Sequence, residues 1–170
     1  MKRIFFILLI FIISVLSTHA FAQSITVLGS DWNVPTPAVP TEAGSDYNPN
    51  LFESIADLIS ISVYIPTSWF DSKTVNVKWE GNPNWNAGLK LHVKKTKNPS
   101  VTPGGCLFCG FSGGSDYIEV LNSNKRFFEV NNGIAAHTFA NAEVQVKISG
   151  VSVAVPTGSY NAKLVFTITD

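Results

Sequence analysis

The sequence of 170 residues has little charge and few reactive side chains. Charged residues make up 14% of the chain, and twelve basic residues balance twelve acidic ones. This balance provides no electrostatic footprint for nucleic acid or for an anionic membrane. Only two cysteines, three histidines and one methionine occur. No serine has the glycine pattern of a nucleophile elbow and no acidic residues have paired spacing, so we predict no enzyme and no cofactor.

The N-terminus has the three-part pattern of a secretory signal peptide. Lys2 and Arg3 form a basic start, residues 4–16 an apolar core, and Ala20-Phe21-Ala22 a small-x-small cleavage site. The apolar run is shorter than the roughly 20 residues that span a bilayer, and an uncleaved N-terminal anchor is the alternative. We expect residues 1–22 to be removed, which leaves an exported protein in the periplasm, at the cell surface or outside the cell. Without Lys2 and Arg3, ten basic residues face twelve acidic ones, a net charge of −2.

Residues 23–170 amount to one domain rich in strand-forming and turn-forming residues. Residues 24–28 predict a first strand, residues 29–50 a proline-rich loop or extension, and residues 51–170 the body of the domain. No helix is predicted beyond a single turn at 51–58. Regularly spaced short strands indicate an all-β fold, an antiparallel β-sandwich of about eight or nine strands, with a closed barrel as the alternative. Strands are predicted at 57–65, 73–79, 89–96, 117–121, 126–130, 143–150 and within 155–170, more weakly at 134–140, and at 151–155 as a continuation or a short separate strand.

The longest alternation of apolar and polar residues is in the last stretch, VPTGSYNAKLVFTITD, residues 155–170. Pro156 and Gly158 make a corner, and the hydroxyl of Tyr160 can reach back to the backbone. This Pro-x-Gly-x-Tyr ending resembles the closing strand of bacterial exported immunoglobulin-like sandwiches of the spore coat U and fimbrial-subunit type. The resemblance implies an immunoglobulin-like fold and a surface or pilus-like structural role. The chain departs from the fimbrial pattern because it lacks a widely spaced cysteine pair.

Cys106 and Cys109 form a C-x-x-C motif in a glycine-rich stretch, PGGCLFCGFSGG, inside a predicted loop at 98–115. Export permits an oxidised pair, so we predict a disulfide that staples the loop and contributes about 2 kcal/mol. A thioredoxin-like redox pair is one alternative, although no helical pattern follows the first cysteine. A zinc site is another. It needs two more ligands, and His92 and His137 are the only histidines left after signal removal.

The tryptophans are the other candidate binding residues. Trp79 shares a strand face with Val75 and Val77 and is expected in the core, whereas the sequence leaves Trp69 ambiguous. Exposed rings of Trp85 and Trp32 could stack on sugars, and the alternative is that each indole caps one end of the core. The side chains expected to donate hydrogen bonds to a sugar around Trp85 are those of Asn82, Asn84 and Asn86.

Lysines make the one basic cluster of the sequence. Lys90, His92 and Lys94 alternate on the outward face of the strand predicted at 89–96, with Lys95 and Lys97 following. A lysine-rich strand is typical of a solvated face or of an edge protected against pairing with another sheet.

Two hypotheses for function follow. The first is an exported structural or adhesive protein that acts through surface contacts, such as a pilus-like or cell-surface subunit, with other subunits as partners that add a strand to an exposed edge. The second is a carbohydrate-binding module that uses Trp85 and Trp32 to bind glycans. Neither involves nucleic acid or a membrane segment after signal cleavage. We expect any site to lie in the loops at 29–50, 81–88 or 98–115.

Overall fold

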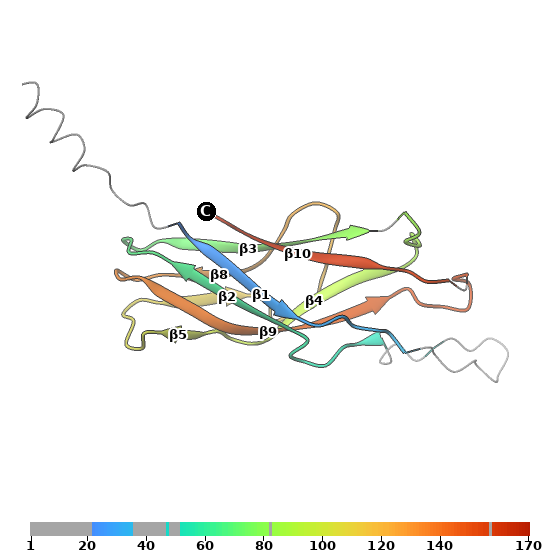
Figure 1. Cartoon of the computed structure of the whole chain (residues 1–170), viewed down its shortest axis with the longest axis horizontal. Helices are drawn as coiled ribbons and strands as arrows, with labels where there is room; N and C mark the ends of the chain where they lie inside the picture. Colours follow the sequence, from blue (N-terminus) through green and yellow to red (C-terminus); the bar gives the residue numbers. More distant parts are fainter. Residues whose placement is uncertain (1–21, 36–46, 48–51, 82, 157) are drawn as a thin grey trace, which may run out of the picture.

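The structure, a computed structural model, describes residues 22–35, 47, 52–81, 83–156 and 158–170. The predicted signal peptide up to residue 21, most of the expected proline-rich loop (36–46 and 48–50), Leu51, Asn82 and Thr157 lie outside these residues. The described chain is nearly all β, and ten strands form two antiparallel sheets, as expected for a β-sandwich (Figure 1). In the same part of the chain, no helix is long and apolar enough to cross a membrane.

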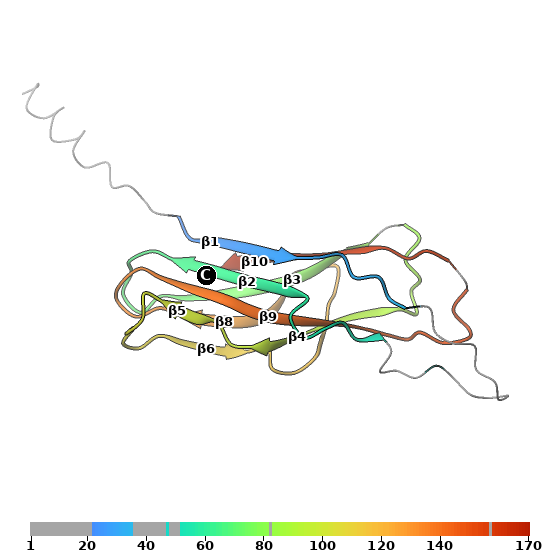
Figure 2. The ribbon, with the colours of Figure 1, turned by 60° about the horizontal axis from the view of Figure 1, so that its bottom comes forward.

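The two sheets have different strand orders. The first runs β1-β2-β9-β4-β7, with β5 also paired to β9, and the second runs β10-β3-β8-β6. Strands of both sheets follow the long axis of the molecule, so the connecting loops gather at its two ends (Figures 1 and 2). The strand bounds are β1 Ser24–Gly29, β2 Ile59–Ile65, β3 Ser72–Gly81, β4 Lys90–Lys97, β5 Ser100–Thr102, β6 Gly110–Gly113, β7 Ile118–Glu119, β8 Lys125–Asn131, β9 His137–Ser149 and β10 Ala162–Thr169.

The core lies between the sheets and is built from side chains at alternate strand positions. Ile61, Val63 and Ile65 of β2 are fully buried, as the alternation at 57–65 predicts. The second sheet supplies Val77 from β3 and Phe166 from β10, both of which are buried. Burying one such side chain stabilises the fold by about 1.5–3 kcal/mol relative to exposing it. Period-two alternation therefore determines which face of each strand meets the core.

Strand β9 corrects the expectation of two separate strands at 134–140 and 143–150. It is one strand of 13 residues, and its pairing with β2 shifts register between Ile61 and Val63. Asn141 has a positive φ of 58° at this irregularity, and both Phe139 and Ala142 are buried. A bulge adds one residue and resets the alternation, which makes a single strand look like two in the sequence.

Three further expectations are corrected. The stretch 98–115, expected to be a loop, contains the short strands β5 and β6. Of the strand predicted at 117–121 only Ile118–Glu119 pairs, and residues 151–155 form a turn rather than a strand, with the Val155 amide donating to the Ser152 carbonyl at 3.0 Å. The corner before β10 is as predicted, since the Tyr160 hydroxyl donates to the Pro156 carbonyl at 2.7 Å.

Candidate functional site

Trp32 and Trp85 lie together at one end of the sandwich. Both line a groove of about 600 Å³ between the segment that follows β1 and the segment that leads into β10. Tyr160, the residue of the corner before β10, lines the same groove. Its remaining walls come from both sheets and are mixed, with apolar side chains such as Leu58, Leu91 and Phe166 and the charged side chains of Asp31 and Lys163.

Both groove tryptophans are half-buried and pack against the core. The Trp85 indole Nε1 donates to the Leu89 carbonyl at 3.0 Å, and its ring centroid lies 5.5 Å from that of Trp79. Asn86 shapes the turn, because its side-chain oxygen accepts a hydrogen bond from the Gly88 amide at 2.8 Å. Trp79, expected in the core, also packs against it. The indoles therefore cap this end of the core and at the same time form one wall of the groove.

Cys106 and Cys109 lie at the opposite end of the sandwich. They are joined by a disulfide, with Cα atoms 5.6 Å apart, which fits the predicted staple. His137 is buried beside them, with its Nδ1 atom 3.7 Å from the Cys106 sulfur. His92, the other histidine considered as a zinc ligand, lies elsewhere and bonds the Ser149 hydroxyl at 2.8 Å. Burial lowers the pKa of His92, against the opposing effect of Glu119.

A buried amide fixes the protonation of His137 Nδ1. Nδ1 lies 2.8 Å from the Asn132 side-chain oxygen and 2.8 Å from the Ala135 carbonyl oxygen. Both oxygens are acceptors, because the Asn132 nitrogen itself donates to the carbonyls of Ala135 (2.7 Å) and Pro66 (3.3 Å). Nδ1 therefore carries a proton and donates it. Cys106, Cys109 and His137 have ligand atoms within 4.8 Å of one another, but Nδ1 is committed to this network.

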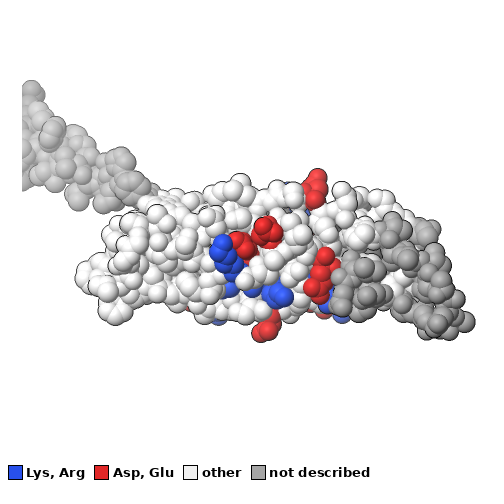
Figure 3. Space-filling model, turned by 90° about the horizontal axis from the view of Figure 1, so that it is seen from below, with Lys and Arg blue, Asp and Glu red and all other residues white. Residues whose placement is uncertain are grey.

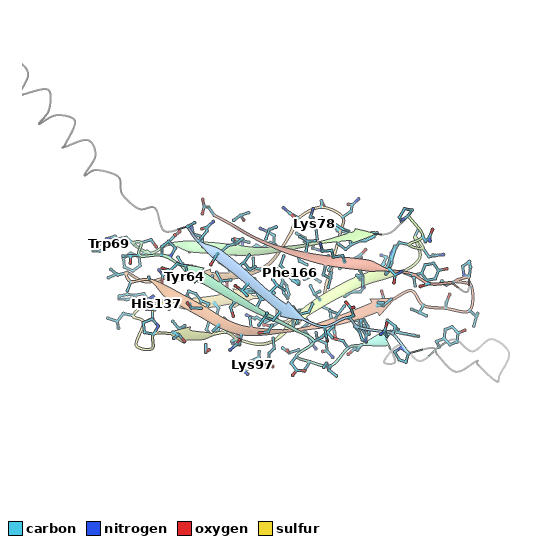
Figure 4. All side chains as sticks on the ribbon, viewed as in Figure 1. Tyr64, Trp69, Lys78, Lys97, His137 and Phe166 are labelled. Carbon is cyan, nitrogen blue, oxygen red and sulfur yellow. A yellow bond between two sulfur atoms is a disulfide. The ribbon has the colours of Figure 1, made fainter. Side chains whose placement is uncertain are left out.

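Around the disulfide, large apolar side chains face solvent. Trp69 is 76% exposed, Phe70 59%, Leu107 73% and Phe108 69%, and we call these four residues the apolar tip. The three aromatic rings lie next to one another: the Phe70 ring centroid is 6.5 Å from that of Trp69 and 5.6 Å from that of Phe108. Trp69 appears at the same end of the molecule as His137 in Figure 4. The sequence left Trp69 without an assigned role and did not single out Leu107 or Phe108.

The loops of the apolar tip are held in an unusual conformation. Phe70 and Phe108 have positive φ angles of 49° and 69°, which bulky residues rarely adopt. The Phe70 amide donates to the Gly133 carbonyl at 2.9 Å, joining the β2–β3 and β8–β9 connections. A Cβ atom at Gly133 would lie 2.1 Å from the Leu107 carbonyl oxygen, so this close approach of the cysteine loop requires glycine. The disulfide encloses Leu107 and Phe108 directly.

The lysine cluster is largely paired. Lys90 pairs with Glu119 at 3.2 Å and Lys97 with Glu143 at 2.6 Å, while the Lys94 ammonium lies 4.6 Å from the centre of the Tyr117 ring. Lys95 instead points inward and is 6% exposed.

The Lys95 ammonium lies 5.4 Å from the Phe111 ring centre and 5.3 Å from that of Phe128. Burial lowers the pKa of Lys95. Residues 94–98 and Ser115 line a shallow, open pocket of about 370 Å³.

Comparisons with protein-family models, with curated proteins and with solved structures found no match.

Proposed function

We propose that this chain is an exported β-sandwich protein with a structural or adhesive role, which works through surface contacts and not through catalysis. The signal-peptide pattern of residues 1–22 supports export. The Pro156, Gly158 and Tyr160 corner and the two-sheet architecture support an immunoglobulin-like sandwich of the spore coat U or fimbrial-subunit type, such as a pilus-like or cell-surface subunit.

The observation that carries the proposal is the apolar tip. Soluble monomers seldom expose contiguous apolar patches of several hundred Å², and such patches mark contact surfaces. Here the rings of Trp69, Phe70 and Phe108 touch in sequence, with Leu107 beside Phe108 in the chain. Backbone strain at two of these residues costs on the order of 1–3 kcal/mol each and persists where the surroundings enforce it. A fold that holds exposed aromatic rings in strained conformations is typical of a surface made for contact.

The test compares a tip variant with a matched control. The tip variant combines Trp69→Ser, Phe70→Asn, Leu107→Ser and Phe108→Asn, because asparagine tolerates a positive φ. The control variant combines Leu28→Ser, Ile55→Ser and Val153→Ser, which are 64%, 66% and 63% exposed outside the tip. Both variants remove strongly exposed apolar side chains, and the control removes them only at positions outside the tip.

The exported protein, purified and fluorescently labelled, is applied to intact bacterial cells, cell-wall polysaccharide, protein-coated surfaces, lipid bilayers and the immobilised chain itself. We expect binding to at least one of these surfaces, weakened about tenfold or more in the tip variant and changed less than about twofold in the control. Absence of binding throughout the panel, or equal binding by all three proteins, would refute the proposal.

A second candidate function, carbohydrate binding, is favoured by the groove. Trp32, Trp85 and Tyr160 come from three separate segments and line one cavity of about 600 Å³, a size suited to a small ligand. Asn33 and Asn161 line it as well and supply hydrogen-bonding groups. Sugar rings stack on such aromatic faces while amides bind their hydroxyls.

A further inference from the structure

We propose that the apolar tip inserts into the interfacial layer of an uncharged, zwitterionic lipid bilayer. This inference deepens the proposed contact role and rests on it, since it names the surface that the tip contacts. The four side chains expose roughly 500 Å² of mostly apolar surface, taking about 150–250 Å² for each aromatic ring. The patch is formed by loops at the end of the sandwich, and neither groove nor pocket among those described is lined by its residues.

The charge pattern of the tip loops fits a zwitterionic surface. Residues 66–70, 103–110 and 133–136 contain no aspartate, glutamate, lysine or arginine. The nearest acidic residue in sequence, Asp71, lies 3.0 Å from the Lys73 ammonium, which also pairs with Asp170. On the face shown in Figure 3, charged side chains lie along the middle of the molecule and are missing from the tip end. An anionic membrane would call for lysine and arginine here.

Side-chain chemistry sets the expected depth of insertion. Trp69 has an indole N–H, and tryptophan is enriched where hydrocarbon meets headgroups. Loop backbone groups cannot enter the hydrocarbon without partners, so the loops stay at headgroup level while the rings reach below it. The cluster of Asp71, Lys73 and Asp170 then remains in water behind the tip.

The tip is pre-organised for this contact. The buried Asn132 network, the disulfide and the Phe70 to Gly133 hydrogen bond fix the three loops before any lipid is met. Insertion therefore does not require ordering the loops, which raises affinity for a given buried area.

The experiment uses the exported protein, without residues 1–22, and large vesicles of pure phosphatidylcholine. We expect co-sedimentation with the vesicles, a blue shift of tryptophan emission, and quenching by brominated phosphatidylcholine. Trp69 should dominate these signals, because it is the one strongly exposed tryptophan among the described residues. The tip variant should bind about a hundredfold more weakly and the control variant equally well, since partitioning follows buried apolar area. Near-ultraviolet circular dichroism confirms that each variant is folded.

Three results would overturn the inference. The first is no binding to phosphatidylcholine vesicles at millimolar lipid. The second is binding that requires phosphatidylserine and is abolished by salt, which would show that the contact is electrostatic attraction to an anionic lipid. The third is concentration-dependent self-association, measured by sedimentation velocity, that the tip variant abolishes without lipid being involved. If vesicles fail but the tip variant still loses binding elsewhere in the panel, the contact role stands and the lipid assignment falls. If the tip variant loses nothing, both fall.

Discussion

Replacing Asn132 by alanine tests whether one buried amide holds the tip loops together. Asn132 is 1% exposed, and its nitrogen donates to the carbonyls of Pro66 and Ala135. Its oxygen accepts from His137 Nδ1 at 2.8 Å. These partners belong to the β2–β3 connection, the β8–β9 connection and the start of β9, so one side chain connects segments that are far apart in sequence.

The cost of Asn132→Ala follows from which partners lose their bonds. Ala135 and His137 still bond each other at 2.8 Å. The Pro66 carbonyl loses its 3.3 Å bond from Asn132 and keeps only the Ser68 hydroxyl, also at 3.3 Å. A partly unsatisfied carbonyl costs about 1–3 kcal/mol, and the lost volume adds about 1 kcal/mol. The total of about 3 kcal/mol lowers Tm by roughly 6–12 °C for a domain of this size.

Thermal unfolding followed by tryptophan fluorescence measures this effect, with hydrogen exchange reporting on residues 66–71, 103–110 and 133–136. Asn124→Ala, at an exposed turn position, is the matched control and should stay within about 0.5 kcal/mol. A Tm for Asn132→Ala within about 2 °C of the parent protein, with unchanged exchange in the loops, would show that the disulfide and backbone alone brace the tip.

Two other predictions concern Lys95 and Trp85. The folded pKa of Lys95 lies below 10.5, so the folded state binds fewer protons than the unfolded state between the two values. Stability should therefore rise with pH through that interval, and Lys95→Met should remove the rise while leaving stability at pH 7 unchanged or up to about 1 kcal/mol higher. Urea unfolding from pH 7 to pH 10 measures the free energy of unfolding of the parent protein and of Lys95→Met. A free energy of unfolding that falls with pH in the parent protein but not in Lys95→Met would contradict the prediction. For the groove, Trp85→Ala should lower binding on a glycan array by about tenfold or more, and absence of binding by the parent protein across broad glycans would end that hypothesis.

Periodicity predicted the parts of the fold that obey it. The alternation from Ile59 to Ile65 became a strand with the expected face buried. The final run became β10, in which Phe166 is buried and Leu164 and Ile168 pack against the core, while Ala162 is exposed. The same alternation holds at Lys95. Leu91, Val93 and Lys95 are alternate residues of β4 and all three are buried, although a lysine would be expected to face solvent.

Sequence reasoning failed where one residue breaks the period or where distant loops meet. The irregularity at Asn141 disguised β9 as two strands. The apolar tip was not predictable, because residues 69–70 and 107–108 are far apart in sequence and meet where the β8–β9 connection packs against both loops. The groove had a partial signal, since Trp32, Trp85 and Tyr160 all lie in turn-rich segments, but no pattern indicated that these segments converge.

The position of β9 governs the order in which the chain can fold. It is the central strand of the larger sheet, between β2 and β4, yet it is the second to last strand in sequence. Its partners in β2 lie about 80 residues earlier in the sequence, and β3 and β10 are separated by a similar number of residues. A chain that emerges from its N-terminus must hold the edges of β2 and β4 unpaired until residue 149 arrives. Such non-local topology folds in about milliseconds to seconds, and during this interval the apolar edges are open to aggregation or to a chaperone.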